Sequence, residues 1–207
     1  MIYCVGDCHA SFFSGYEDLI EPWPHGKTGD GPYFRATRIE RVSVSKELMW
    51  KIDRISKVID SLNISENDYL LLVYGEPDCR RDIPKFLTEH PNADYHETIN
   101  SFAQEYIKCI EFFNKKYNMI ILGVFGQGVT PRNSYYTQKK RNKIVVDFNW
   151  HIGSYCAEND IPFVNIFDDM VDDGTTKRGW LKSDLDIHLS QKAMPTVLKK
   201  FKDMGLI

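Results

Sequence analysis

Several features that would define a protein class are missing from the sequence. No apolar run approaches the roughly 20 residues that a helix needs to cross a bilayer, so we predict no membrane span. The chain does not open with a basic segment, an apolar stretch and a small-residue cleavage site, so we expect no signal peptide. The net charge is only −3 and the pI is about 6.1. We therefore expect neither nucleic acid nor an anionic membrane surface as a partner.

Cysteine is scarce, and its placement excludes the common cysteine frameworks. The five cysteines include no CxxC pair and are Cys4, Cys8, Cys79, Cys109 and Cys156. An odd, dispersed set in a chain of 207 residues indicates reduced thiols, so we predict a cytoplasmic protein. A zinc site built from paired cysteines is not expected. From the sequence alone we assign no metal and no cofactor.

Phosphate-loop and calcium-loop signatures are missing as well. The glycine-containing segment 126–133 (GQGVTPRN) lacks the Lys-Ser/Thr pair of a phosphate loop, and its glycines have the wrong spacing. Aspartates cluster within 168–173, but a solvated turn explains them better than a cation site does.

What the sequence does contain is an alternation of short apolar runs and longer amphipathic segments. The runs are nearly continuous, which is typical of parallel strands buried on both faces. They predict strands at 2–6, 69–75, 119–126 and 162–167. The segments between them place apolar residues every three or four positions, as one face of a helix requires. They predict helices at 43–62, 97–117, about 141–158 and about 190–204.

This order of elements predicts one three-layer α/β domain over residues 1–207, with a mostly parallel sheet and helices on both faces. Two segments, 21–42 and 79–96, show little periodicity and are predicted to be long loops. In the last helix, Ser190 is the predicted N-cap and Gly205 the predicted C-terminal stop.

Reactive side chains follow the first two strands and precede the last helix. In open parallel sheets, ligands bind beyond the carboxyl ends of the strands, so these side chains should share one edge. They are Asp7, Cys8 and His9, then Glu76, Asp78, Arg80 and Arg81, and finally Asp184, Asp186 and His188. A thiol beside an imidazole is a sound nucleophilic arrangement, because the imidazole favours the thiolate form.

The motifs also resemble a known family. VGDCHASF near the N-terminus and DLDIHLS before the last helix are similar to the first and last blocks of the SGNH (GDSL) hydrolase superfamily. Together with GPYFRATRI and VYGEPDCRRDI, they resemble a GDSH-type subgroup associated with polysaccharide biosynthesis. The ordered set spans the whole chain. The resemblance implies a flavodoxin-like three-layer α/β fold.

The resemblance also implies roles for single residues. Cys8 takes the position of the nucleophile and His188 that of the base, with Asp186 or Asp184 as the acid that orients it. Gly31 is the best candidate for the oxyanion-hole glycine, although Gly26 and Gly29 compete. The remaining substrate-binding or oxyanion candidates are Asp7, His9, Glu76, Asp78 and Arg80.

Three positions depart from the family pattern. The nucleophile position holds cysteine instead of serine, and the oxyanion asparagine is replaced by Pro77, which has no N–H to donate. Leu185 stands three residues before His188, where the family has its acid. Losing one oxyanion donor costs about 10²–10³ in turnover. Arg80, three residues after Pro77, could place a cation where the amide is missing.

The residues therefore favour an enzyme that acts on an acyl or ester group of a carbohydrate, as esterase or acyltransferase. One alternative is non-acyl glycan chemistry, such as glycosyl or methyl transfer, with Glu76 or Asp78 as the general base. Another is a glycan-binding module without turnover, in which Cys8 is an inert buried thiol. Glu76, Asp78 and Arg80 could equally form a buried ion-pair network.

Overall fold

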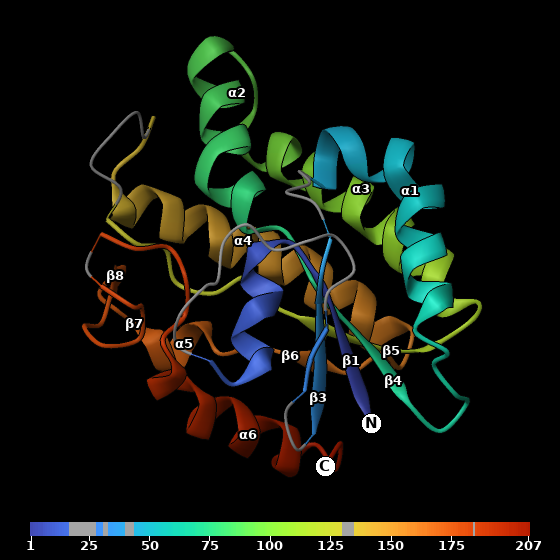
Figure 1. The fold of residues 1–207 in the computed structure, drawn as a ribbon. Helices are drawn as coiled ribbons and strands as arrows, with labels where there is room; N and C mark the ends of the chain where they lie inside the picture. The colour runs from blue at the N-terminus through green and yellow to red at the C-terminus, as the bar shows by residue number, and fades with distance from the viewer. Residues whose placement is uncertain (17–27, 31–32, 40–43, 130–134, 184) are drawn as a thin grey trace.

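The computed structural model describes residues 1–16, 28–30, 33–39, 44–129, 135–183 and 185–207 (Figure 1). The sheet at its centre has the strand order β2-β3-β1-β4-β5-β6. Its strands are β1 Ile2–Gly6, β2 Thr28–Asp30, β3 Phe34–Arg38, β4 Tyr69–Val73, β5 Asn118–Leu122 and β6 Phe163–Val164. All neighbours pair in parallel except β2, which runs antiparallel to β3 at the edge. The predicted mostly parallel sheet is confirmed.

Helices cover both faces of this sheet, as the sequence predicts. They are η1 Cys8–Ser14, α1 Val44–Ser61, η2 Asp78–Asp82, α2 Ile83–Glu89, α3 Tyr95–Asn114, α4 Gln138–Glu158, α5 Phe167–Met170, η3 Gln191–Ala193 and α6 Met194–Asp203. A small hairpin of β7 Val171–Asp172 and β8 Thr175–Thr176 follows α5. Among these helices, η1 and η3 are 3₁₀ and η2 is π-helical.

The core has one layer on each side of the sheet because successive strand residues point to opposite faces. Leu70 and Leu72 of β4 pack with residues of α1, α3 and α4, while Leu71 and Val73 pack with residues of η1 and α6. In Figure 1, α6 accordingly lies across the sheet from α1 and α3. This arrangement confirms the flavodoxin-like three-layer prediction.

The two predicted long loops are corrected by the structure. The segment 79–96 holds most of η2, all of α2 and the start of α3. Pro84 suggested a break, but it occupies the first turn of α2, where a missing N–H costs nothing. The segment 21–42 holds β2 and β3, which we did not predict because FRATR mixes polar and apolar residues. Tyr33 and Ile39, which flank β3, are also described. The rest of that segment lies outside the described residues.

The remaining predictions on the helices mostly agree with the structure. Ser190 caps η3 by accepting a hydrogen bond from the Lys192 N–H, and Gly205 follows α6 with a φ of 69°. The strands β4 and β5 end at Val73 and Leu122, earlier than predicted. None of the helices in the described ranges combines the length and the apolar character that crossing a bilayer requires.

Candidate active site

Asp7, Cys8, His9 and Glu76 closely follow the carboxyl ends of two adjacent strands, β1 and β4. Gly6 ends β1 beside Val73 of β4, and a Cβ on Gly6 would lie 2.1 Å from the Val73 carbonyl oxygen. Only glycine therefore lets the two strand ends approach this closely. Gly75 has a φ of 98°, which turns the chain after β4 so that Glu76 follows directly. Asp7 to His9 and Glu76 consequently emerge side by side.

Asp7 shapes the turn that carries the nucleophile candidate. Its Oδ1 accepts a hydrogen bond from the His9 N–H at 2.9 Å, which caps the 3₁₀ helix that begins at Cys8. Its Oδ2 has no hydrogen-bond partner among the described residues. Burial raises the pKa of Asp7 above its usual value, although the nearby His9 charge opposes this. The role of Asp7 in the geometry is therefore to hold Cys8 and His9.

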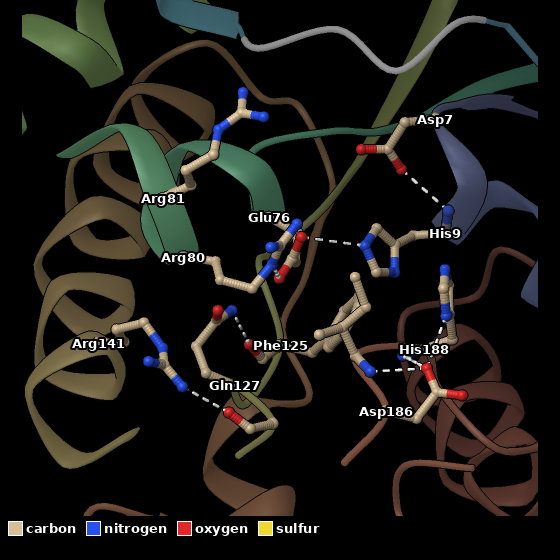
Figure 2. Close-up of polar contacts among 12 residues, drawn as sticks. Asp7, His9, Glu76, Arg80, Arg81, Phe125, Gln127, Arg141, Asp186 and His188 are labelled. Carbon is tan, nitrogen blue, oxygen red and sulfur yellow. Dashed lines mark hydrogen bonds and ion pairs between the residues drawn. The ribbon is translucent and has the colours of Figure 1, made fainter. Parts of the chain in front are cut away.

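His9, Glu76 and Arg80 form a buried charged chain. His9 Nε2 lies 3.1 Å from Glu76 Oε2, and Arg80 Nε donates to Glu76 Oε1 at 2.7 Å (Figure 2). Burial alone would raise the pKa of Glu76, but hydrogen bonds and charge from His9 and Arg80 lower it to about 2. Burial also acts to lower the pKa of His9, yet the Asp7 and Glu76 carboxylates outweigh it and raise that pKa. His9 is therefore held towards the imidazolium form.

A second carboxylate–histidine pair precedes the last helices. Asp186 Oδ1 lies 2.7 Å from His188 Nδ1 and also accepts the backbone N–H groups of Ile187 and His188 at 2.6 and 2.9 Å. Burial, followed by the charge on His9, lowers the pKa of His188. The imidazole is therefore neutral at pH 7, with Nδ1–H donated to Asp186 and a lone pair on Nε2. His188 Nε2 has no hydrogen-bond partner within the part of the chain that the structure describes.

The two histidines and Cys8 converge on one point. One ligand atom each of Cys8, His9 and His188 lies within 4.8 Å of the others. The two rings are 4.9 Å apart between centroids, and Figure 2 shows the unbonded nitrogen of His9 facing that of His188. The predicted proximity of Cys8 and His188 is therefore present. Cys8 is buried at the start of η1, so it adjoins the base with little solvent around it.

The other site candidates are placed less directly. Asp78 is fully buried in η2, and Arg81 pairs with Asp82 at 2.8 Å, away from the Glu76 chain. Pro77 directly precedes η2 and supplies no N–H to the site. Gly31, Gly26 and Asp184 lie outside the described residues, whereas Gly29 belongs to β2. Asp186 contacts His188 through its Oδ1, and the alternative acid Asp184 stays untested.

Sequence reasoning missed the residues that hold the segment after β5. Asn149 of α4 exchanges two hydrogen bonds with the backbone of Val124, at 2.8 and 2.7 Å, and Asn142 Oδ1 accepts from the Gln127 N–H at 2.8 Å. This segment presents Phe125 edge-on to the His9 ring, with centroids 5.1 Å apart. Two asparagines seven positions apart on one helix were the available signal, because that spacing puts them on the same face.

Comparison with known proteins agrees with this architecture. No protein-family model and no curated protein sequence matches the chain. Solved structures do. A lipolytic protein of the G-D-S-L family from Veillonella parvula has a TM-score of 0.57 at 15% identity, covering 98% of this chain and 96% of its own.

Two further structures extend the comparison. A GDSL-like lipase from Bacteroides thetaiotaomicron has a TM-score of 0.61 at 13% identity, covering 99% of this chain and 86% of its own. A catalytic mutant of an acetylxylan esterase from Geobacillus stearothermophilus has a TM-score of 0.60 at 11% identity, covering 100% and 94%. The chain therefore has the fold of the SGNH (GDSL) hydrolase superfamily.

Proposed function

We propose that this protein is an acyl-ester hydrolase or acyltransferase that acts on a carbohydrate through Cys8, His188 and Asp186. The observation that carries the proposal is the Asp186–His188 pair, whose open Nε2 lies next to Cys8. A neutral imidazole held by a carboxylate is the arrangement that activates a hydroxyl or thiol nucleophile. The similar structures that carry the names lipase and acetylxylan esterase support ester chemistry.

In the proposed reaction, His188 Nε2 takes the thiol proton of Cys8 as the sulfur attacks the acyl carbon. The tetrahedral intermediate collapses to a thioester, and His188 returns the proton to the leaving alcohol. Water, or the hydroxyl of an acceptor sugar, then attacks the thioester by the same route. Asp186 keeps the Nδ1–H tautomer in place and stabilises the imidazolium that forms.

Pro77 stands where the family has its oxyanion-binding asparagine, so the proposed reaction needs other oxyanion donors. The backbone N–H of Cys8 is one proposed donor, and Gly31 remains the predicted second. The raised pKa of His9 favours its protonated ring, and its Nδ1 has no hydrogen-bond partner in the described ranges, so an Nδ1–H there can take the place of the missing amide. Arg80 lies behind it, on Glu76, and keeps the local charge balanced. We therefore propose His9 as the closest electrostatic substitute for the asparagine.

Non-acyl glycan chemistry is less well supported by the geometry. Glu76 would be its general base, but both of its oxygens are already occupied by His9 and Arg80. Its pKa of about 2 makes it a weak proton acceptor at neutral pH. The glycan-binding alternative without turnover stays a second proposal, because an inactive hydrolase would keep the same strand ends and polar side chains.

The test is turnover of an acetylated xylose or a similar acetylated sugar by the wild type, Cys8→Ala and His188→Ala. Cys8→Ala is expected to lose on the order of 10⁴–10⁶-fold in kcat. A short-chain and a long-chain lipid ester assayed in parallel separate a carbohydrate from a lipid preference. Equal rates in all three proteins would remove both residues from the mechanism.

Two matched controls make that assay specific. Cys156→Ala removes another buried thiol, in α4, and His151→Gln removes a half-buried histidine on the same helix. Both should keep wild-type turnover. Cys8→Ser distinguishes the chemistry from the fold. Residual or improved activity in that variant supports acyl transfer at this position, whereas wild-type binding of acetylated sugars with no turnover in any form supports the binding module.

We also propose that the protein is cytoplasmic. All five cysteines are buried thiols and none forms a disulfide. Cys8 must stay reduced to act as a nucleophile, which a reducing compartment ensures.

A further inference from the structure

The convergence of Cys8, His9 and His188 is also the donor set of a metal site. Thiolate and imidazole are the ligands that Zn²⁺ prefers, in tetrahedral geometry. One ligand atom from each of the three residues lies within 4.8 Å of the others. Tetrahedral Zn²⁺, with bonds of about 2.0–2.3 Å, needs ligand atoms roughly 3.3–3.7 Å apart. Small rotations of the side chains would meet that requirement.

The nitrogens that face the centre of the site are the ones left open. Neither His9 Nδ1 nor His188 Nε2 has a hydrogen-bond partner among the described residues. Figure 2 shows these two atoms directed towards each other. His9 is only 4% exposed, so solvent does not supply a hydrogen bond to its open nitrogen. An unpartnered buried polar atom of this kind is costly unless a ligand completes it.

Each histidine also has the outer partner that a metal ligand requires. A metal-bound histidine usually donates its second ring N–H to a carboxylate, which fixes the tautomer and raises the ligand's basicity. His9 Nε2 is 3.1 Å from Glu76 Oε2, and His188 Nδ1 is 2.7 Å from Asp186 Oδ1. Both open nitrogens are thus preset for coordination by the carboxylate behind them.

The charges around the site suit a divalent cation. Asp7, Glu76 and Asp186 contribute three carboxylates, and Arg80 is already paired with Glu76 at 2.7 Å. A Cys8 thiolate adds a fourth negative charge when the metal binds. Binding releases the thiol proton and the Nδ1 proton of His9, while each histidine keeps its N–H to the carboxylate.

We propose that Cys8, His9 and His188 bind Zn²⁺ with three protein ligands, leaving a fourth position for water or another ligand. Metal binding does not depend on the proposed function. The effect of the metal on activity does rest on the proposed function. Bound Zn²⁺ occupies the Cys8 sulfur and His188 Nε2, so it inhibits the proposed acyl chemistry reversibly. The sequence analysis assigned no metal because the chain has no CxxC pair, although it placed these three residues at one edge of the sheet.

The experiment uses Co²⁺ in place of Zn²⁺, because Co²⁺ adopts the same geometry and absorbs light. The full chain, stripped with a chelator, is titrated with Co²⁺ and then with Zn²⁺. We expect one equivalent of Co²⁺ to give the intense visible bands of tetrahedral cobalt and a thiolate-to-cobalt charge-transfer band, both removed by Zn²⁺. Cys8→Ser should lose the charge-transfer band, and His9→Gln and His188→Gln should each weaken binding at least about 10-fold.

Further variants separate this site from incidental metal binding. Asp186→Asn leaves all three ligands in place and should still lower Zn²⁺ affinity about 10–100-fold. His151→Gln, a matched histidine change on α4, should leave the titration unchanged. A cobalt spectrum that is octahedral, or one that keeps its thiolate band in Cys8→Ser, overturns the proposal. So does an affinity that neither His9→Gln nor His188→Gln alters.

The same proteins keep the two proposals apart. If cobalt binds as described and no variant or wild type turns over acetylated sugars, the metal site stands and the acyl function fails. If esters are turned over and Zn²⁺ neither binds nor slows the reaction, the function stands and the metal site is wrong. Restoration of activity by chelator after inhibition by one equivalent of Zn²⁺ supports both.

Discussion

The two carboxylate–histidine pairs of the site have the same composition but different electrostatics. In the buried pair, Glu76 and His9 are joined by Arg80, and the pKa of His9 is raised. In the outer pair, Asp186 and His188 are partly exposed, and the pKa of His188 is lowered. The centroids of the His9 and His188 rings lie only 4.9 Å apart.

The difference comes from what surrounds each pair. His9 has two carboxylates near it, Asp7 and Glu76, and together they outweigh the cost of burying its charge. His188 has one, Asp186, and its gain is offset by burial and by the charge on His9 itself. The pKa values of two histidines so close together are thus shifted in opposite directions, so one suits the role of electrophile and the other that of base.

Among changes to the two carboxylate–histidine pairs, the largest effect on activity should come from removing the base of the outer pair. His188→Gln removes the proton acceptor and is expected to lower kcat/KM for an acetylated sugar by about 10²–10⁴-fold. His151→Gln is the matched control and should leave kcat/KM unchanged. Steady-state kinetics with both proteins check this. A loss of the same size in the control would point to the fold and not to the site.

Removing the carboxylates should affect stability unequally. Glu76→Gln leaves His9 and Arg80 without their buried counter-charge and is expected to lower the free energy of unfolding by about 3–5 kcal/mol. Asp186→Asn breaks a partly exposed pair and should cost about 1 kcal/mol or less. Urea denaturation at pH 7 measures both. Equal losses would mean that the two pairs do not differ in burial as described.

The pH profile should sharpen the comparison. The proposed reaction needs neutral His188, so kcat/KM should fall as the pH drops through the His188 pKa, which lies below 6.5. His9→Gln removes a charge that lowers that pKa, so the acid limb should move to higher pH. Asp186→Asn removes a carboxylate that raises it, so the limb should move to lower pH. Shifts in the same direction in the two variants would contradict the assignment.

The smallest expected effect concerns the cap that follows the outer pair. Ser190 accepts a hydrogen bond from the Lys192 N–H and begins η3, two residues after His188. Ser190→Ala is expected to lower the free energy of unfolding by about 1 kcal/mol. Ser190→Asp, which can cap equally well, should keep wild-type stability. Thermal unfolding of the two variants tests this, and an equal loss in both would assign Ser190 a role in packing.

Much of the fold could be predicted from the sequence because its signals are local. The apolar runs at Ile2–Gly6 and Tyr69–Val73 are continuous because both faces of those strands are buried. The stripes of α1 and α3 repeat with the period of a helix for the same reason. The strand β3 was missed because Arg35 and Arg38 interrupt its apolar residues, and its pairing with β1 on one side and β2 on the other makes it a strand.

The site likewise has a part that local sequence signals predict and a part that depends on the tertiary structure. The sequence by itself determined that the acid beside His188 is a near neighbour, Asp186 or Asp184, and in the structure Asp186 contacts both the ring and the backbone N–H of His188. The pairing of His9 with Glu76 spans 67 positions and exists only because β1 and β4 are adjacent and parallel. Tertiary structure alone decided that the pKa of His9 is raised and that of His188 lowered, since burial and Coulomb interactions depend on distances in space and not along the chain.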